Sequence, residues 1–277
     1  MYKIGLSSCG YPLTEQNFAA LQKANIEAVE ISMHPDLYSA IDYRNVKELS
    51  DRYNLQIWSY HLPFYPFDRT DVASLDKAIR QKTINAYTEY IAKASDIGCK
   101  IFVVHPSGEP IEDDKREQHF LCAMETLDKL AEIAAKYGSF IAVEDLPRSC
   151  LGNTTEEMLR LIGVNDKLKV CFDTNHLLKG DPVEFVDKIG SKIITLHVSD
   201  YDFVDEKHWL PYEGDLNWPK LVDALKRANY NGVWMYELRT ETPKTMDRKR
   251  ILTFEDIYKN GKDILNGKIP EIIGTRK

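Results

Sequence analysis

The sequence lacks the features that mark membrane, secreted and disulfide-rich proteins. No run of residues is long and apolar enough to span a bilayer, and the chain begins with a strand-like pattern instead of the apolar stretch of a signal peptide. The five cysteines are scattered, odd in number and never spaced as C-x-x-C, which indicates reduced thiols. We therefore expect a cytoplasmic protein that has no contact with a membrane.

The sequence also lacks an excess of positive charge and two common phosphate-binding motifs. Its 36 Lys and Arg residues against 43 Asp and Glu residues give a net charge of −7, so no nucleic-acid partner is expected. The basic cluster of Lys244, Arg248, Lys249 and Arg250 is typical of a solvated loop. Neither G-x-G-x-x-G after the first strand nor G-x-x-x-x-G-K-[ST] occurs, which disfavours dinucleotide and triphosphate sites.

What the sequence does contain is a regular alternation of short apolar runs with longer amphipathic stretches. Strands are predicted at 4–9, 28–33, 57–60, 101–104, 140–143, 170–172, 193–196 and 233–236. Helices are predicted after Thr14, at 43–53, 71–97 and 113–137, after Thr154, after Asp181, and at 219–229 and 253–266. Eight strand–helix units without a linker favour the α/β class, as one (β/α)8 TIM barrel domain over residues 1–277.

Local signals support several of these helix ends. Thr154 and Glu157 have the spacing of a capping box, in which each side chain binds the backbone of the other residue. Asp181 precedes Pro182, so a cap is followed by proline at the first helical position. Gly98 follows the predicted 71–97 helix and supplies its stop.

The segment 169–176 joins a buried strand to a pair of ionisable residues. Its apolar run ends at Asp173, and His176 follows three residues later. Such a pair at the end of a buried strand costs free energy unless water, a helix terminus or a metal ion compensates it. Alternatively, Asp173 caps the next helix and His176 is an ordinary loop residue.

An ionisable residue at the end of an apolar run recurs along the chain. Six predicted strands end in a residue that can bind a metal or move a proton. These residues are His61, His105, Glu144, Asp173, His197 and Glu237. Each has an ordinary explanation by itself, as a cap or as a core histidine bonded to a carbonyl group. In a (β/α)8 barrel, however, all of these strand ends lie on the face where barrel enzymes hold their active sites.

Four of the six close consecutive strands and predict a metal site. Glu144, Asp173, His197 and Glu237 supply three carboxylates and one imidazole, a set that suits a hard or borderline divalent ion. We expect one such ion, Mn²⁺ in the first place, with Zn²⁺, Co²⁺ or Mg²⁺ as substitutes. Without a cation, three carboxylates this close would repel each other, and at least one would take up a proton.

The two glutamates of this set predict proton-transfer chemistry. Glu144 and Glu237 stand at the two ends of the arc, so a substrate between them would have one carboxylate on each face. This arrangement suits removal of a proton next to a carbonyl group and its return from either side, through an enediolate that the metal stabilises. The long connection at 201–217 carries His208, which with Arg239 is a candidate for binding substrate hydroxyl groups or a phosphate.

At this point the chain resembles the xylose-isomerase-like barrel superfamily, which includes sugar phosphate isomerases and epimerases and endonuclease-IV-like proteins. The resemblance covers nearly the whole chain and rests on Tyr60-His61-Leu62-Pro63, Val104-His105-Pro106, Val143-Glu144-Asp145, Phe172-Asp173-Thr174-Asn175-His176, Leu196-His197-Val198-Ser199-Asp200, His208-x-x-Pro211-x-x-Gly214-x-x-x-Trp218 and Tyr236-Glu237-Leu238. It implies one divalent ion on the four residues above, the two glutamates as the acid/base pair, and substrate contact from His176.

Two departures from the family limit what the resemblance implies. Ketose 3-epimerases look to carry Gly-Glu and an arginine just after the histidine of strand seven, whereas Val198 and Ser199 follow His197 here. Endonuclease IV binds three zinc ions, one of them through an Asp-x-His in the loop that follows. Here Asp205 and His208 are three positions apart instead of two, which disfavours that third ion.

The sequence therefore predicts a metal-dependent isomerase or epimerase of a small-molecule sugar, sugar phosphate or cyclic polyol. We expect five residues to contact the substrate: His61, His105, His176, His208 and Arg239. An inosose-dehydratase-like lyase would share the first proton transfer. Two further classes stay open, an endonuclease-IV-like zinc phosphodiesterase and a barrel that only binds a sugar. A homo-oligomer is compatible with each of these functions.

Overall fold

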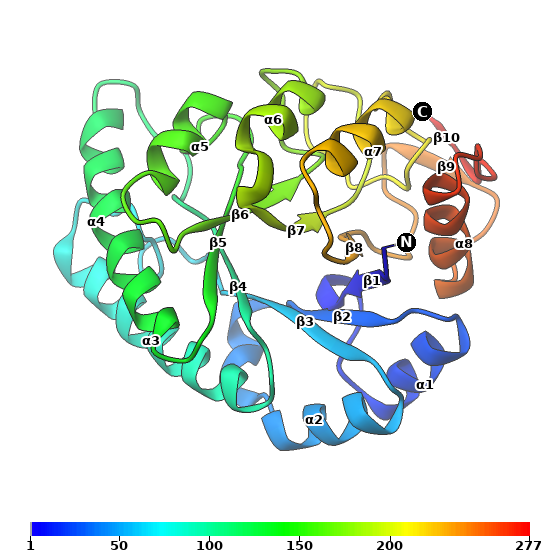
Figure 1. Ribbon diagram of the computed structural model, residues 1–277, viewed down its shortest axis with the longest axis horizontal. Helices are drawn as coiled ribbons and strands as arrows, with labels where there is room; N and C mark the ends of the chain where they lie inside the picture. The colour runs from blue at the N-terminus through cyan, green and yellow to red at the C-terminus, as the bar shows by residue number, and fades with distance from the viewer. Residues whose placement is uncertain (1) are drawn as a thin grey trace.

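Eight parallel strands form a nearly closed barrel in the computed structural model, which describes residues 2–277, and helices surround the strands (Figure 1). The strands are β1 Ile4–Ser7, β2 Ala28–Ile31, β3 Gln56–His61, β4 Ile101–Val104, β5 Phe140–Glu144, β6 Lys169–Asp173, β7 Ile193–His197 and β8 Trp234–Tyr236. Each strand from β1 to β6 pairs in parallel with the next, and β8 pairs with β1. A bridge from Val198 to Tyr236 joins β7 to β8. The predicted (β/α)8 TIM barrel is confirmed.

Each strand is followed by a helix, as predicted. The helices are α1 Glu15–Lys23, α2 Tyr43–Arg52, α3 Lys77–Asp96, α4 Arg116–Ala135, α5 Thr155–Ile162, α6 Pro182–Ile189, α7 Trp218–Arg227 and α8 Phe254–Leu265. Asp181 caps α6, because its Oδ1 accepts hydrogen bonds from the backbone N–H groups of Val183 and Glu184 at 2.7 and 3.0 Å. Among the described residues, no helix is long and apolar enough to cross a membrane.

The predicted capping box at α5 forms only in part. Thr154 accepts a hydrogen bond from the N–H of Glu157 at 3.3 Å. The Glu157 carboxylate does not return to Thr154 but accepts from Arg116 at 2.7 and 2.8 Å. A charged guanidinium is a stronger donor than a backbone amide, and it ties α5 to α4. The structure forms a complete capping box at the start of α8 instead.

Helix α3 begins six residues later than the sequence predicts. Segment 71–76 folds as turns because the Asp71 carboxylate accepts from the N–H of Ala73 at 2.9 Å and from Gly108 at 3.2 Å. Asp76 then caps the helix through the N–H of Ala78 at 2.7 Å. A long-range contact to the loop after β4 therefore overrides the helical periodicity of this segment.

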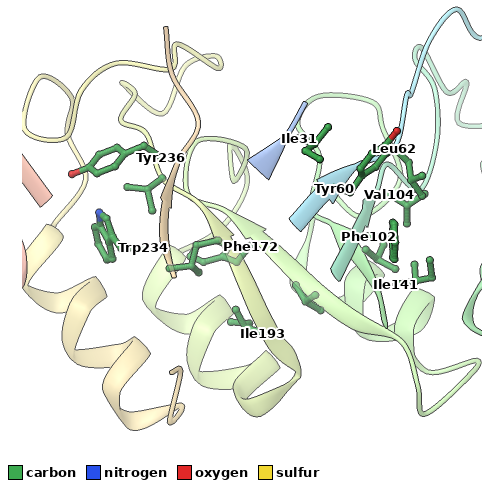
Figure 2. Close-up of a cluster of buried hydrophobic side chains, with 14 of the residues drawn as sticks. Ile31, Tyr60, Leu62, Phe102, Val104, Ile141, Phe172, Ile193, Trp234 and Tyr236 are labelled. Carbon is green, nitrogen blue, oxygen red and sulfur yellow. The ribbon is translucent and has the colours of Figure 1, made fainter. Parts of the chain in front are cut away.

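The apolar core has two layers, because side chains alternate between the two faces of a strand. The outer layer lies between barrel and helices, and Figure 2 shows part of it, with Phe102, Phe172 and Trp234 buried there. The interior of the barrel holds smaller clusters that include Val103 and Cys171. Gly5 belongs to the inward set, since a Cβ there would touch the Met235 side chain at 2.7 Å.

The same alternation carries the strand-end residues into the mouth of the barrel. Val143, Phe172 and Tyr236 belong to the outer layer, so Glu144, Asp173 and Glu237, one position further on, turn inward. His197 ends β7 in the same way. The fold thus brings all four predicted ligands together at the carboxyl ends of the strands.

A two-stranded ribbon was not predicted. It consists of β9 Met246–Arg248 and β10 Gly274–Arg276, which pair antiparallel. The expectation of a solvated basic loop is wrong for Arg248, whose side chain is buried and bound to Glu213 at 2.5 Å. The ion pair ties the ribbon to the long loop after β7, which a charge count along the sequence does not reveal.

Candidate metal centre

Glu144, Asp173, His197 and Glu237 converge at the carboxyl ends of β5 to β8. Nδ1 of His197 lies 2.9 Å from Oε1 of Glu144, 3.4 Å from Oε2 of Glu237 and 3.9 Å from Oδ2 of Asp173. One donor atom from each of the four residues lies within 4.8 Å of all the others. We refer to these residues as the four-residue group.

The four-residue group fits a divalent cation. Oδ2 of Asp173 is buried and has no hydrogen-bond partner among the described residues. Burial raises the pKa of the Asp173 carboxyl well above its ordinary value; His176 opposes this, and the charges of Glu237 and Glu144 add to it. This agrees with the expectation that crowded carboxylates would retain a proton. A cation bound there would satisfy the free oxygen and remove the repulsion.

Glu30 of β2 orients the histidine of the four-residue group and was missed by the sequence reasoning. Its Oε2 lies 3.0 Å from Nε2 of His197, so the imidazole presents Nδ1 to the carboxylates. Ser7 and Ser59 donate to the Glu30 carboxylate at 2.9 and 2.7 Å, and Glu30 is fully buried. A glutamate inside the apolar run Ala-Val-Glu-Ile was the available signal, since a buried charge needs partners.

His61 and His105 lie against the other oxygen of Glu144. Nε2 of each ring is 3.2 Å from Oε2 of Glu144, and one donor atom from each of the three residues lies within 4.8 Å of the others. Nδ1 of His61 lies 2.9 Å from the carbonyl oxygen of Leu62, which it binds as an N–H donor. Nε2 of His61 then faces Glu144 either as an imidazolium N–H or as a lone pair directed at a cation.

A third group consists of His176, Glu206 and His208. Glu206, in the loop after β7, was not among the residues predicted from the sequence. Nε2 of His176 lies 3.3 Å from Oε2 of Glu206, and His208 completes a set of donor atoms within 4.8 Å. Burial opposes ionisation of Glu206, but the hydrogen bond and charge of His176 lower its pKa to about 2. Asp205 and His208 are three positions apart, whereas Glu206 and His208, which meet here, are two positions apart.

Arg148 explains why Asp205 is absent from this group. Its guanidinium binds Asp205 at 2.9 Å, Glu206 at 3.1 Å and Glu109 at 2.8 Å. Three loops, after β4, β5 and β7, are joined by this one side chain. Asp205 is thus engaged by Arg148, whereas Glu206 contacts both Arg148 and His176.

The long loop at 201–217 is anchored through Asp200. Oδ1 of Asp200 accepts from the N–H of Leu216 at 3.2 Å, and Oδ2 accepts from the N–H of Tyr212 and from Nε1 of Trp218, both at 2.8 Å. The position next to this carboxylate requires glycine, because a Cβ on Gly214 would overlap Oδ1 of Asp200. The loop is therefore an ordered part of the mouth. It positions His208 so that Nδ1 of this residue lies 3.2 Å from the carbonyl oxygen of Glu237.

The remaining predicted substrate residues lie at the edge of the four-residue group. His208 and Arg239 line a cavity of about 1120 Å³ that reaches Glu237. Arg239 is exposed, and its side chain lies against Gly10, where a Cβ would come within 3.1 Å. His61, His105 and His176 instead face carboxylates of the groups described above. The structure thus brings every predicted site residue to one mouth but divides them into separate clusters.

Comparison with known proteins agrees with this geometry. Residues 18–263 match the family described as xylose isomerase-like TIM barrel. The uncharacterized protein MJ1311 of Methanocaldococcus jannaschii is 30% identical, over 97% of this chain and 92% of the relative. Fructoselysine 3-epimerase of Shigella flexneri is 22% identical, over 92% and 99%. A crystal structure of a D-tagatose 3-epimerase-like protein superposes with a TM-score of 0.74 at 28% identity, over 87% of this chain and 91% of that one.

Proposed function

Because this chain belongs to the xylose isomerase-like TIM barrel family, we propose that it is a divalent-metal-dependent sugar isomerase or epimerase that works by proton transfer through an enediolate. Support for the isomerase class comes from the 3-epimerase-like crystal structure and from fructoselysine 3-epimerase. The substrate is a small-molecule sugar or sugar phosphate. The observation that carries the proposal is that both glutamates lie close to Nδ1 of His197, at 2.9 and 3.4 Å.

The metal would be held by the four-residue group. The unpartnered oxygen of Asp173 supplies a free ligand atom, and Glu30 fixes the ring of His197 in the orientation that ligation needs. When bound, a divalent ion would polarise the carbonyl and the adjacent hydroxyl oxygen of the substrate and stabilise negative charge there. Mn²⁺ is the first candidate, since oxygen and imidazole ligands together suit it.

The surroundings of the two glutamates support different roles for them within this proposal. Glu237 lines the cavity, and its side chain is 13% exposed. Glu237 is therefore the group that takes the proton from the carbon next to the carbonyl, as the electron pair of the C–H bond moves toward the carbonyl oxygen. Glu144 is buried, and Nε2 of His61 and Nε2 of His105 each lie 3.2 Å from its Oε2, within reach for proton transfer. Glu144 returns a proton to the opposite face of the substrate.

Solvent exchange tests this proposal directly. A panel of ketoses incubated in D₂O with the metal-loaded protein should gain one deuterium at a carbon next to the carbonyl, as nuclear magnetic resonance measures. A dehydratase would make the same exchange but would also release water and form a new carbonyl product, so product analysis separates the two. The absence of exchange with any sugar of the panel would count against the proton-transfer mechanism. A protein that only binds a sugar would behave in that way.

A second candidate function is zinc-dependent phosphodiester hydrolysis of the endonuclease-IV type. It is favoured by the two further groups of donor atoms: His61 and His105 with Glu144, and His176 and His208 with Glu206. Together with the four-residue group they would accommodate more than one ion, as two-metal and three-metal hydrolysis requires. The net charge of −7 opposes a nucleic-acid substrate. Two or three equivalents of zinc per chain would favour this candidate over the first.

A further inference from the structure

The cavity beside Glu237 extends well past the four-residue group. It runs over the ends of β8, β1 and β2, and its volume of about 1120 Å³ is slightly above the usual range for sites that enclose drug-sized ligands. Its inner end is polar and includes Glu237 and His208. Much of its remaining wall is apolar and consists of Met33, Leu37, Ile41, Phe64, Tyr65 and Leu238, with the Phe64 ring stacked on His105.

The apolar wall is a built part of the fold. It follows the short 3₁₀ helix η2 Pro35–Ala40 and its flanking residues. Tyr38 fixes η2 to the barrel, because its hydroxyl group donates to the carbonyl oxygen of His61 at 2.6 Å and accepts from the N–H of Met33 at 3.4 Å. Leu37, next to this anchor, remains 54% exposed. A rigid apolar surface left open beside a reactive centre indicates a ligand group that covers it.

The charges around the cavity do not select an ion. The cavity is lined by three cationic residues, Lys207, Arg239 and Lys244. It is also lined by three acidic residues, Asp42, Glu237 and Glu241. An unmodified ketose carries hydroxyl groups on nearly every carbon, and these gain no hydrogen bonds from an aliphatic or aromatic wall. An apolar group would instead gain free energy from burial there.

We propose that the substrate is a keto sugar that carries an uncharged aryl or alkyl substituent, and that this substituent occupies the cavity walled by η2. The inference rests on the proposed function, since the sugar's reacting carbons are placed between Glu144 and Glu237. The continuity of the cavity with Glu237 argues for part of the substrate, and not a partner protein, as the occupant. The substituted sugar bridges the polar and the apolar ends.

The test compares free ketohexoses with ketohexoses that carry a phenyl or octyl ether at C1 or at C6. Calorimetric titration gives the dissociation constant of each compound, and deuterium exchange gives its kcat/KM. For at least one position of the ether, we expect binding about tenfold tighter than that of the free sugar, from burial of the apolar group. Leu37→Asp should remove most of that preference. Leu121→Asp is the matched control, because Leu121 is 57% exposed and does not line the cavity.

The outcomes separate this inference from the proposed function. If free and substituted sugars bind equally, the inference is overturned whether or not exchange occurs. If the ethers bind more tightly but no sugar exchanges deuterium, the cavity is an apolar ligand site, and it is the proton-transfer mechanism that fails. If Leu37→Asp changes the oligomeric state and leaves the binding ratio as in the wild type, the wall is an interface between copies of this chain, which also overturns the inference.

Discussion

Nε2 of His197 lies 3.0 Å from a carboxylate oxygen of Glu30, although β7 and β2 are not neighbours in the sheet. The contact crosses the interior of the barrel below the four-residue group. It determines which nitrogen of the imidazole faces the carboxylates, because Glu30 accepts the proton of the other one. The candidate metal centre therefore depends on a strand that supplies none of its ligands.

Replacing Glu30 by Gln should weaken metal binding with the fold retained. The amide keeps the size of the side chain but removes the charge that strengthens the imidazole as a ligand, so metal affinity should fall by about 10- to 100-fold. Competition with a fluorescent chelator measures the affinity, and circular dichroism checks the fold. Glu27→Gln is the control, since Glu27 lies next to the other end of β2 and is exposed. Unchanged affinity in Glu30→Gln would show that His197 does not need this partner.

Replacing Glu144 or Glu237 by Gln should abolish proton exchange. An amide cannot remove or return a proton at neutral pH, and loss of a general acid or base costs about 10²- to 10⁴-fold in rate. Deuterium incorporation into substrate gives the rate for each variant after metal loading has been confirmed. Glu241→Gln is a suitable control, because Glu241 lines the same cavity outside the four-residue group. Turnover that persists unchanged in Glu237→Gln would remove the two-glutamate mechanism.

Metal content should be about one equivalent per chain in protein purified without added metal or chelator. Asp173→Asn should lose that metal, because Oδ2 of Asp173 is the unpartnered oxygen of the four-residue group. Restoring metal to chelator-treated wild-type protein at 100 times its dissociation constant should raise the free energy of unfolding by about 2.7 kcal/mol. Elemental analysis and urea denaturation make the two measurements. Full metal occupancy in Asp173→Asn would place the ion elsewhere.

The convergence of the four-residue group could be predicted from the sequence because its members obey a local rule. Glu144 and Asp173 each end an apolar run, and the alternation of side chains along a strand turns them inward once their neighbours Val143 and Phe172 are buried outside. All parallel strands of a barrel end on one face, so strand ends that are distant in sequence meet there. This rule holds whatever the structure of the loops between the strands.

The residues that were missed depend on non-local geometry. Glu30 lies within an apolar run and not at its end, so the strand-end rule does not identify it. Its partner His197 is 167 positions away. Asp205 binds Arg148 across 57 positions, and Glu206 contacts both Arg148 and His176. Helix α3 starts late for the same kind of reason, since the N–H of Gly108 donates a hydrogen bond to the carboxylate of Asp71. Periodicity carries no information about such contacts, which form only when the barrel closes.

The loop at 201–217 offers a test of whether its order matters for the candidate metal centre. Gly214→Ala places a Cβ against Oδ1 of Asp200 and the carbonyl oxygen of Tyr201, neither of which is the end of a long flexible side chain. The Asp200 carboxylate would have to move away from the N–H groups that it holds, at a cost of about 1–3 kcal/mol in the free energy of unfolding. Because the same loop positions His208 beside Glu237, exchange activity should fall with it.

Gly138→Ala is the matched comparison for this effect. Gly138 has a φ of 61°, and a Cβ added there would meet nothing within 4 Å, so alanine costs about 1 kcal/mol through backbone strain alone. It follows α4 at the end opposite the mouth, so stability should fall while exchange activity stays at the wild-type level. Urea denaturation and deuterium exchange, measured on both variants, separate the two effects. Equal activity in Gly214→Ala and Gly138→Ala would mean that the 201–217 loop does not need its Asp200 anchor for catalysis.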